Sequence, residues 1–87
     1  MMLCEMFIDN MSCFIIVSLD DDGDVYTVNI HNRKGPLEST EHTTENSAKD
    51  YAYAYIKSNY TKDTLIVARS KQHGTCRDIS DYIFKGA

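Results

Sequence analysis

The chain has 87 residues, of which 43% are hydrophobic and 25% are charged, and its formal net charge is −4. This length fits one domain with a small core, which leaves little room for an enclosed active site. The composition is that of a globular protein and argues against disorder. We therefore expect a single domain over residues 1–87 and no enzymatic activity.

The first eleven residues are apolar in places, but Glu5 and Asp9 interrupt them and they include no lysine or arginine. This pattern fits neither a secretory signal nor a membrane span. It predicts that residues 1–11 are a loosely attached N-terminal segment.

Three strands are predicted in the next part of the chain. Residues 12–19 carry apolar side chains on both faces, which is typical of a central strand. Residues 20–24 read DDDGD, a composition that favours a hairpin turn, and residues 25–32 alternate like a half-buried antiparallel strand. Residues 37–44 are polar and predict a solvent-facing edge strand.

A helix is predicted over residues 46–59, with N-cap candidates between Thr44 and Ser47. Five residues fall at the spacing i, i+3, i+4, i+7 and i+8 and form an apolar stripe. They are Ala48, Tyr51, Ala52, Tyr55 and Ile56.

Residues 64–69 predict a fourth strand, and residues 78–85 predict a short C-terminal helix. The element order is then β-β-β-α-β followed by that helix. The expected fold class is α+β, with an antiparallel sheet and one helix packed on one of its faces.

Charge is divided unevenly along this order. Residues 1–50 hold ten acidic and three basic residues, a net charge of −7. Residues 51–87 hold three acidic and six basic residues, a net charge of +3. Such asymmetry can mark interaction surfaces, although it disappears in three dimensions if the two halves interleave.

Metal binding and cofactor chemistry have weak support in the sequence. A calcium loop that begins at Asp20 needs glycine at its sixth position and glutamate at its twelfth, where this chain has Val25 and His31. His73 and Cys76 have a ligand-like spacing, but a structural zinc site needs a second close pair. We therefore expect no metal and no cofactor.

The cysteines indicate a reducing environment. Cys4, Cys13 and Cys76 are odd in number and have no CxxC spacing, so we expect reduced thiols and a cytoplasmic protein. A cysteine-dependent enzyme that pairs Cys76 with His73 is a third functional hypothesis. It would need a base within hydrogen-bond reach and an oxyanion site.

The acidic residues of the first half provide the first candidate interaction surface. They could mimic a nucleic-acid backbone and occupy the basic groove of another protein, although an acidic surface that serves only solubility is the alternative. Tyr53 lies about 200° around the helix from Tyr51 and is expected to be exposed as an interface anchor, with Lys49 and Lys57 on the same helix face. The predicted protein-binding residues are Asp20, Asp21, Asp22, Asp24, Glu38, Glu41 and Tyr53.

A smaller basic cluster near the end of the fourth predicted strand gives the alternative function. Arg69, Lys71 and Arg77 could contact phosphate groups of RNA or single-stranded nucleic acid. The acidic remainder of the molecule would slow the approach of such a polyanion.

The length, the element order over residues 12–69, the acidic turn at residues 20–24 and the lack of a catalytic motif resemble, in type, the small anti-defence proteins of bacteriophages. Anti-CRISPR proteins belong to that class. The resemblance implies a non-enzymatic protein that binds and inhibits a host protein or complex in the host cytoplasm, and it implies no particular site residues. The sequence hypothesis is therefore an inhibitor of a host protein, with no membrane partner and with homodimerisation left open.

Overall fold

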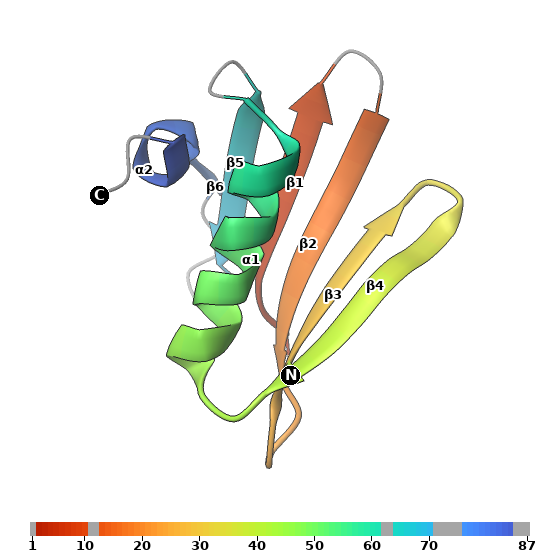
Figure 1. The fold of residues 1–87 in the computed structure, drawn as a ribbon, viewed down its shortest axis with the longest axis vertical. Helices are drawn as coiled ribbons and strands as arrows, with labels where there is room; N and C mark the ends of the chain where they lie inside the picture. The colour runs from red at the N-terminus through yellow and green to blue at the C-terminus, as the bar shows by residue number, and fades with distance from the viewer. Residues whose placement is uncertain (1, 11–12, 62–63, 71–75, 85–87) are drawn as a thin grey trace.

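A computed structural model describes residues 2–10, 13–61, 64–70 and 76–84. Six strands form one antiparallel sheet with the order β4-β3-β2-β1-β5-β6 (Figure 1). The predicted α+β fold, with one main helix on an antiparallel sheet and a short C-terminal helix, is confirmed. The elements in chain order are β1 (Met2–Asn10), β2 (Cys13–Asp21), β3 (Tyr26–Asn32), β4 (Gly35–His42), α1 (Glu45–Asn59), β5 (Leu65–Ser70), β6 (Cys76–Asp78) and α2 (Ser80–Phe84).

The N-terminal strand β1 lies inside the sheet, between β2 and β5. The expectation that residues 1–11 are loosely attached is therefore wrong for Met2–Asn10. Ile8 is completely buried, whereas Glu5 and Asp9 occupy the alternate, odd-numbered positions of the strand. Because side chains alternate along a strand, the two acids lie on the other face of the sheet and do not interrupt the buried one.

The acidic turn between β2 and β3 has the geometry that its sequence predicts. Gly23 has a φ of 96°, a conformation that favours glycine. The backbone N–H of Gly23 donates to Asp21 Oδ1 at 2.9 Å, an Asx-type bond that closes the turn.

Helix α1 follows the edge strand β4 and begins with a side-chain cap. Thr44 Oγ1 accepts from the backbone N–H of Ser47 at 3.1 Å, so Thr44 is the N-cap among the predicted candidates. No helix in the described part of the chain is long and apolar enough to cross a membrane.

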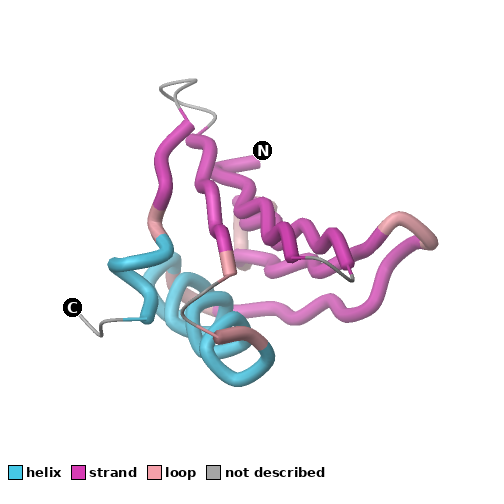
Figure 2. Tube along the Cα trace, turned by 90° about the horizontal axis from the view of Figure 1, so that it is seen from above, coloured by secondary structure: helices cyan, strands magenta, loops and turns pink. Residues whose placement is uncertain are grey.

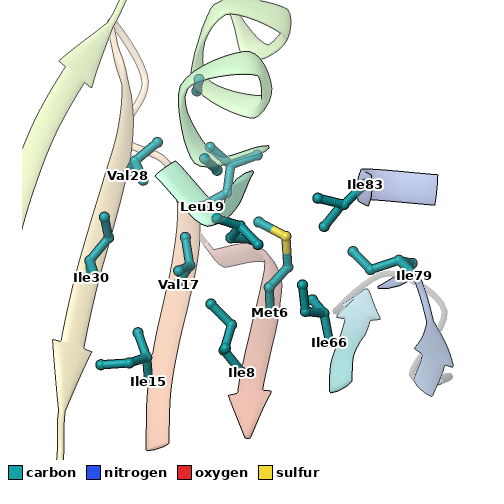
Figure 3. Close-up of a cluster of buried hydrophobic side chains, with 13 residues drawn as sticks. Met6, Ile8, Ile15, Val17, Leu19, Val28, Ile30, Ile66, Ile79 and Ile83 are labelled. Atoms are coloured by element: carbon teal, nitrogen blue, oxygen red, sulfur yellow. The ribbon is translucent and has the colours of Figure 1, made fainter. Parts of the chain in front are cut away.

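The core lies between one face of the sheet and the two helices (Figure 3). Helix α1 contributes its small and branched side chains, α2 contributes Ile83, and Ile79 lies just before α2. Each fully buried aliphatic side chain contributes roughly 1.5–3 kcal/mol to the free energy of unfolding. The core residues are Met6, Ile8, Ile15, Val17, Leu19, Val28, Ile30, Ala48, Ala52, Ile56, Ile66, Ile79 and Ile83.

The C-terminal part is tied to β5 by two hydrogen bonds. The N–H of Ile79 donates to the Ile66 carbonyl, and the N–H of Ile66 donates to Ser80 Oγ, both at 2.9 Å. These bonds hold α2 on the same side of the sheet as α1, and Figure 2 shows both helices on that side. The short strand β6, which the sequence analysis did not predict, directly precedes α2.

Candidate functional site

The second face of the sheet, here called the open face, carries no helix in the part of the chain that the structure describes. Its side chains come from the alternate positions of each strand, those that do not point into the core. This uncovered face has a mixed apolar and charged character that the packing of the core does not explain. It is therefore the candidate functional surface.

An apolar patch occupies one end of the open face, on the central strands. Phe7 of β1 is aligned with Ile16 of β2 on one side and with Val67 of β5 on the other. All three are half-buried. Next to this row, Phe14 stacks against Phe7 with ring centroids 6.3 Å apart. Leu65 extends the patch on β5 and is 48% exposed.

Carboxylates lie beside this patch and at the far end of the same face: Glu5, Asp9 and Asp78 adjoin the patch, whereas Asp20, Asp22 and Glu41 lie at the opposite end of the strands. Five occupy open-face positions by the sheet register, and a sixth lies in the turn after β2, where it accepts a hydrogen bond from the open-face Thr27. Two guanidinium groups lie on the same face. The open face is therefore acidic with an apolar end. The carboxylates are Glu5, Asp9, Asp20, Asp22, Glu41 and Asp78, and the guanidinium groups are Arg33 and Arg69.

Several polar side chains of the open face are held in place by their neighbours. Asn29 Nδ2 donates to Asp20 Oδ2 at 3.1 Å, and Ser39 Oγ donates to Asn29 Oδ1 at 2.8 Å. At the opposite edge, Asp78 Oδ1 accepts from the N–H of Ser80 at 2.9 Å. This bond holds the pKa of the Asp78 carboxyl below its ordinary value. The acidic surface is thus partly preorganised.

The predicted protein-binding residues divide between two surfaces. Asp20 and Glu41 lie on the open face, Asp21 ends β2 opposite Tyr26, and Asp22 and Asp24 lie in the adjoining turn. Glu38 and Tyr53, also predicted, do not lie on the open face. Both belong to the layer that contains the helices.

Glu38 is part of a polar cluster that joins β4 to α1. The Tyr51 hydroxyl donates a short hydrogen bond to Glu38 Oε1, and this bond raises the pKa of the Tyr51 phenol. His42 contacts the Tyr51 ring at 5.2 Å between centroids, and its ring nitrogens lie 2.9 Å from Thr40 Oγ1 and 3.3 Å from Ser47 Oγ. These contacts fix the edge strand to the helix and give Glu38 a structural role.

Tyr53 is half-buried and packs against the core, so the expectation that it is exposed is wrong. Helix α2 packs beside α1, and Tyr82 of α2 meets the Tyr53 ring edge-on at 5.7 Å. On the neighbouring helix surface, Lys49 Nζ pairs with Glu45 Oε2 at 3.1 Å, which raises the pKa of the lysine. Of the helix face predicted around Lys49, Tyr53 and Lys57, Tyr53 therefore packs within the molecule, whereas Lys57 is exposed and Lys49 forms a partly exposed ion pair.

The predicted basic cluster is only partly placed. Arg69 lies on the open face, where its Nη2 atom is 2.9 Å from Glu5 Oε1. Arg77 belongs to β6 as the register partner of Ala68, but its side chain and the whole of Lys71 lie outside what the structure describes. The one placed arginine of this cluster is already neutralised by a carboxylate.

Catalytic and metal chemistry gain no support from the described residues. No group of three or more metal-ligating side chains gathers there. Burial raises the pKa of the Cys4 thiol, which makes it less nucleophilic. The predicted pair His73 and Cys76 cannot be placed, because His73 and the Cys76 side chain lie outside the described residues.

The sequence analysis did not identify Phe7 and Asp9 as surface residues of a strand. The signal was present: Met6 and Ile8 alternate with Phe7 and Asp9, which is the period of a strand with one buried face. The two acids were instead interpreted as interruptions of an apolar run.

Comparison with known proteins found no match: no protein-family model, curated protein or solved structure is significantly similar to this chain.

Proposed function

We propose that this chain is a non-enzymatic interaction protein that binds a basic surface of another protein through its open face and thereby blocks it. The observation that supports this proposal most directly is the acidity of the open face, which no helix covers in the described part of the chain: six carboxylates lie on it or in its adjoining turn, and three of them, Glu5, Asp9 and Asp78, lie next to the apolar patch. Basic grooves that bind nucleic acid are surfaces of complementary charge. The proposed partner is therefore a nucleic-acid-binding protein of a host cell, and the proposed role of this chain is that of a bacteriophage anti-defence factor.

The apolar patch supplies binding affinity that charge alone does not provide. Charges at the rim of an interface mainly accelerate and orient the encounter, whereas buried aromatic and aliphatic side chains contribute most of the affinity. Phe7, Phe14 and Leu65 provide such side chains next to the carboxylates.

Nucleic acid fits the open face less well, because its phosphates would meet the same carboxylates. Arg69, which the alternative function requires, is paired with Glu5. A polyanion would have to break this pair and overcome the repulsion of the surrounding acids.

A pair of isosteric double variants tests the proposal. Asp9→Asn/Glu41→Gln neutralises two exposed open-face carboxylates, and Glu45→Gln/Asp50→Asn neutralises two carboxylates on α1. Each immobilised variant is exposed to lysate of the source cells, and the retained proteins are identified and quantified at increasing salt. We expect the open-face variant to lose at least about fivefold in retention of a salt-sensitive partner, and the α1 variant to retain it.

Equal retention by both variants would contradict the proposal. So would retention of RNA or DNA in place of protein, particularly if Arg69→Ala abolished it. The second result would establish the alternative function.

A further inference from the structure

The aromatic end of the open face combines a stacked pair of rings with an exposed carboxylate. The Phe7 and Phe14 rings are stacked with an interplanar angle of 29°. Asp9 is the register partner of Phe14 on β2 and of Leu65 on β5, so its exposed carboxylate rises between an aromatic and an aliphatic side chain. Side chains directly opposite each other on one face of a sheet have Cβ atoms about 5 Å apart.

A guanidinium group already lies on this surface. The Cζ atom of Arg33, from the turn between β3 and β4, is 5.7 Å from the centroid of the Phe14 ring. This distance is within the range of a cation–π contact. The chain therefore shows directly that the ring accepts an arginine side chain.

The Asp9 carboxylate has no corresponding cation. It makes no ion pair or hydrogen bond with any residue that the structure describes. The surface thus presents an aromatic platform together with an unneutralised carboxylate at its edge. These are the two groups that recognise a guanidinium: the planar cation stacks on a ring and donates two parallel hydrogen bonds to a carboxylate.

We propose that Asp9, Phe7 and Phe14 form a binding site for an arginine side chain of the protein partner. The inference rests on the proposed function, and it specifies the residue type that the partner must present. The arginine stacks on the phenylalanine pair, donates to the Asp9 carboxylate, and takes apolar flanking contacts from Ile16 and Leu65. Lysine fits this site less well, because its ammonium is compact and more strongly hydrated and cannot make a bidentate pair.

A second copy of the chain is a poorer occupant than a basic partner. Packing two open faces together would bring the carboxylates of both copies into one interface, where like charges repel. An unstacked base of a nucleic acid could stack on the same rings and donate from an amino group to the carboxylate, but its phosphates would be repelled by the acidic face.

The test uses two short peptides that differ in one residue, acetyl-Leu-Arg-Leu-amide and acetyl-Leu-Lys-Leu-amide. Each is titrated into the full chain and followed by backbone amide and aromatic-ring NMR shifts. We expect the arginine peptide to shift the signals of Phe7, Asp9 and Phe14 and to bind about fivefold or more tightly than the lysine peptide. Asp9→Asn should remove most of this preference, whereas Asp50→Asn, an exposed carboxylate on α1, should preserve it.

Arg33 provides a second test with its own control. Because Arg33 occupies the Phe14 ring, Arg33→Ala should strengthen binding of the arginine peptide. The effect should exceed that of Lys34→Ala, which removes the same charge from the adjacent exposed position. The matched pair separates competition for the ring from general electrostatics.

Three results would overturn the inference: no shifts at the aromatic end, equal affinity for the two peptides, or equal binding by Asp9→Asn and wild type. If the peptide titrations give one of these three results but neutralising Asp9 and Glu41 still releases the partner, the proposed function stands and only the arginine site is rejected. If the peptides bind as expected but that double variant keeps its partner, the arginine site stands and the proposed function fails.

Discussion

Replacing Ile8 by alanine tests the position of β1 at the centre of the sheet. Ile8 is fully buried, so the substitution removes three carbon atoms from the core. The lost transfer free energy is about 2.4 kcal/mol at roughly 0.8 kcal/mol for each methylene. The cavity that remains adds to this value, so we expect a total loss of about 3–4 kcal/mol in the free energy of unfolding.

This loss is large for a chain of this length. At roughly 0.05–0.15 kcal/mol per residue, the whole domain has a stability of about 4–13 kcal/mol. The variant should therefore melt about 12–30 °C below wild type, because 1 kcal/mol corresponds to about 4–8 °C in a domain of this size. Equilibrium urea unfolding followed by circular dichroism measures the free energy, and thermal melting checks it independently.

Asp9→Ala is the matched control, since Asp9 is the next residue of the same strand and is exposed on the opposite face. Its effect should stay within about 0.5 kcal/mol. If Ile8→Ala and Asp9→Ala have the same small effect, β1 does not contribute to the core, and the six-stranded arrangement is refuted.

The remaining predictions concern α1 and its surroundings. Thr44→Ala should destabilise the domain by about 1 kcal/mol in urea unfolding because it removes the helix N-cap, whereas Thr43→Ala at the adjacent exposed position should have little effect. Tyr51→Phe should cost about 0.5 kcal/mol at neutral pH because the bond to Glu38 lies close to solvent. The raised pKa of Tyr51 stabilises the fold below the ordinary phenol value of about 10, and this contribution is lost as the pH rises through the folded pKa. Between roughly pH 9 and pH 11, the free energy of unfolding measured in urea should fall less for Tyr51→Phe than for wild type. An identical fall in both would exclude Tyr51 as its source. Because burial raises the pKa of Cys4, alkylation by iodoacetamide at about pH 8, mapped by mass spectrometry, should be about tenfold or more slower in the folded chain than in urea.

Local sequence patterns were sufficient for the elements that repeat a simple period. The apolar residues on both faces at 12–19 predicted a central strand, and β2 indeed has a neighbour on each side. The stripe from Ala48 to Ile56 predicted α1 and the face that it buries. Strand β1 was not predicted, because Glu5 and Asp9 interrupt the apolar run in sequence even though both lie on one face of the strand.

The composition of the candidate site could be predicted only in part. Glu38 and Glu41 are three positions apart, and in a strand an odd difference in position places two side chains on opposite faces. That conclusion was within reach of the sequence. By contrast, the alignment of Asp9 with Leu65 and the position of α2 over Tyr53 depend on which distant segments pair, and no local pattern specifies this.

The insertion of β1 between β2 and β5 has a consequence for the order in which the molecule assembles. Strands β1 to β4 form a meander of neighbours in sequence, which can pair locally and early. The pairing of β1 with β5 instead joins residues such as Glu5 and Arg69, which are 64 positions apart, and closing such a loop costs about 4 kcal/mol of chain entropy. Without β5, one edge of β1 would be unpaired beside the ring of Phe7, and unpaired strand edges favour aggregation. The late, long-range pairing of β5 thus covers a strand edge that could otherwise pair with another copy of the chain.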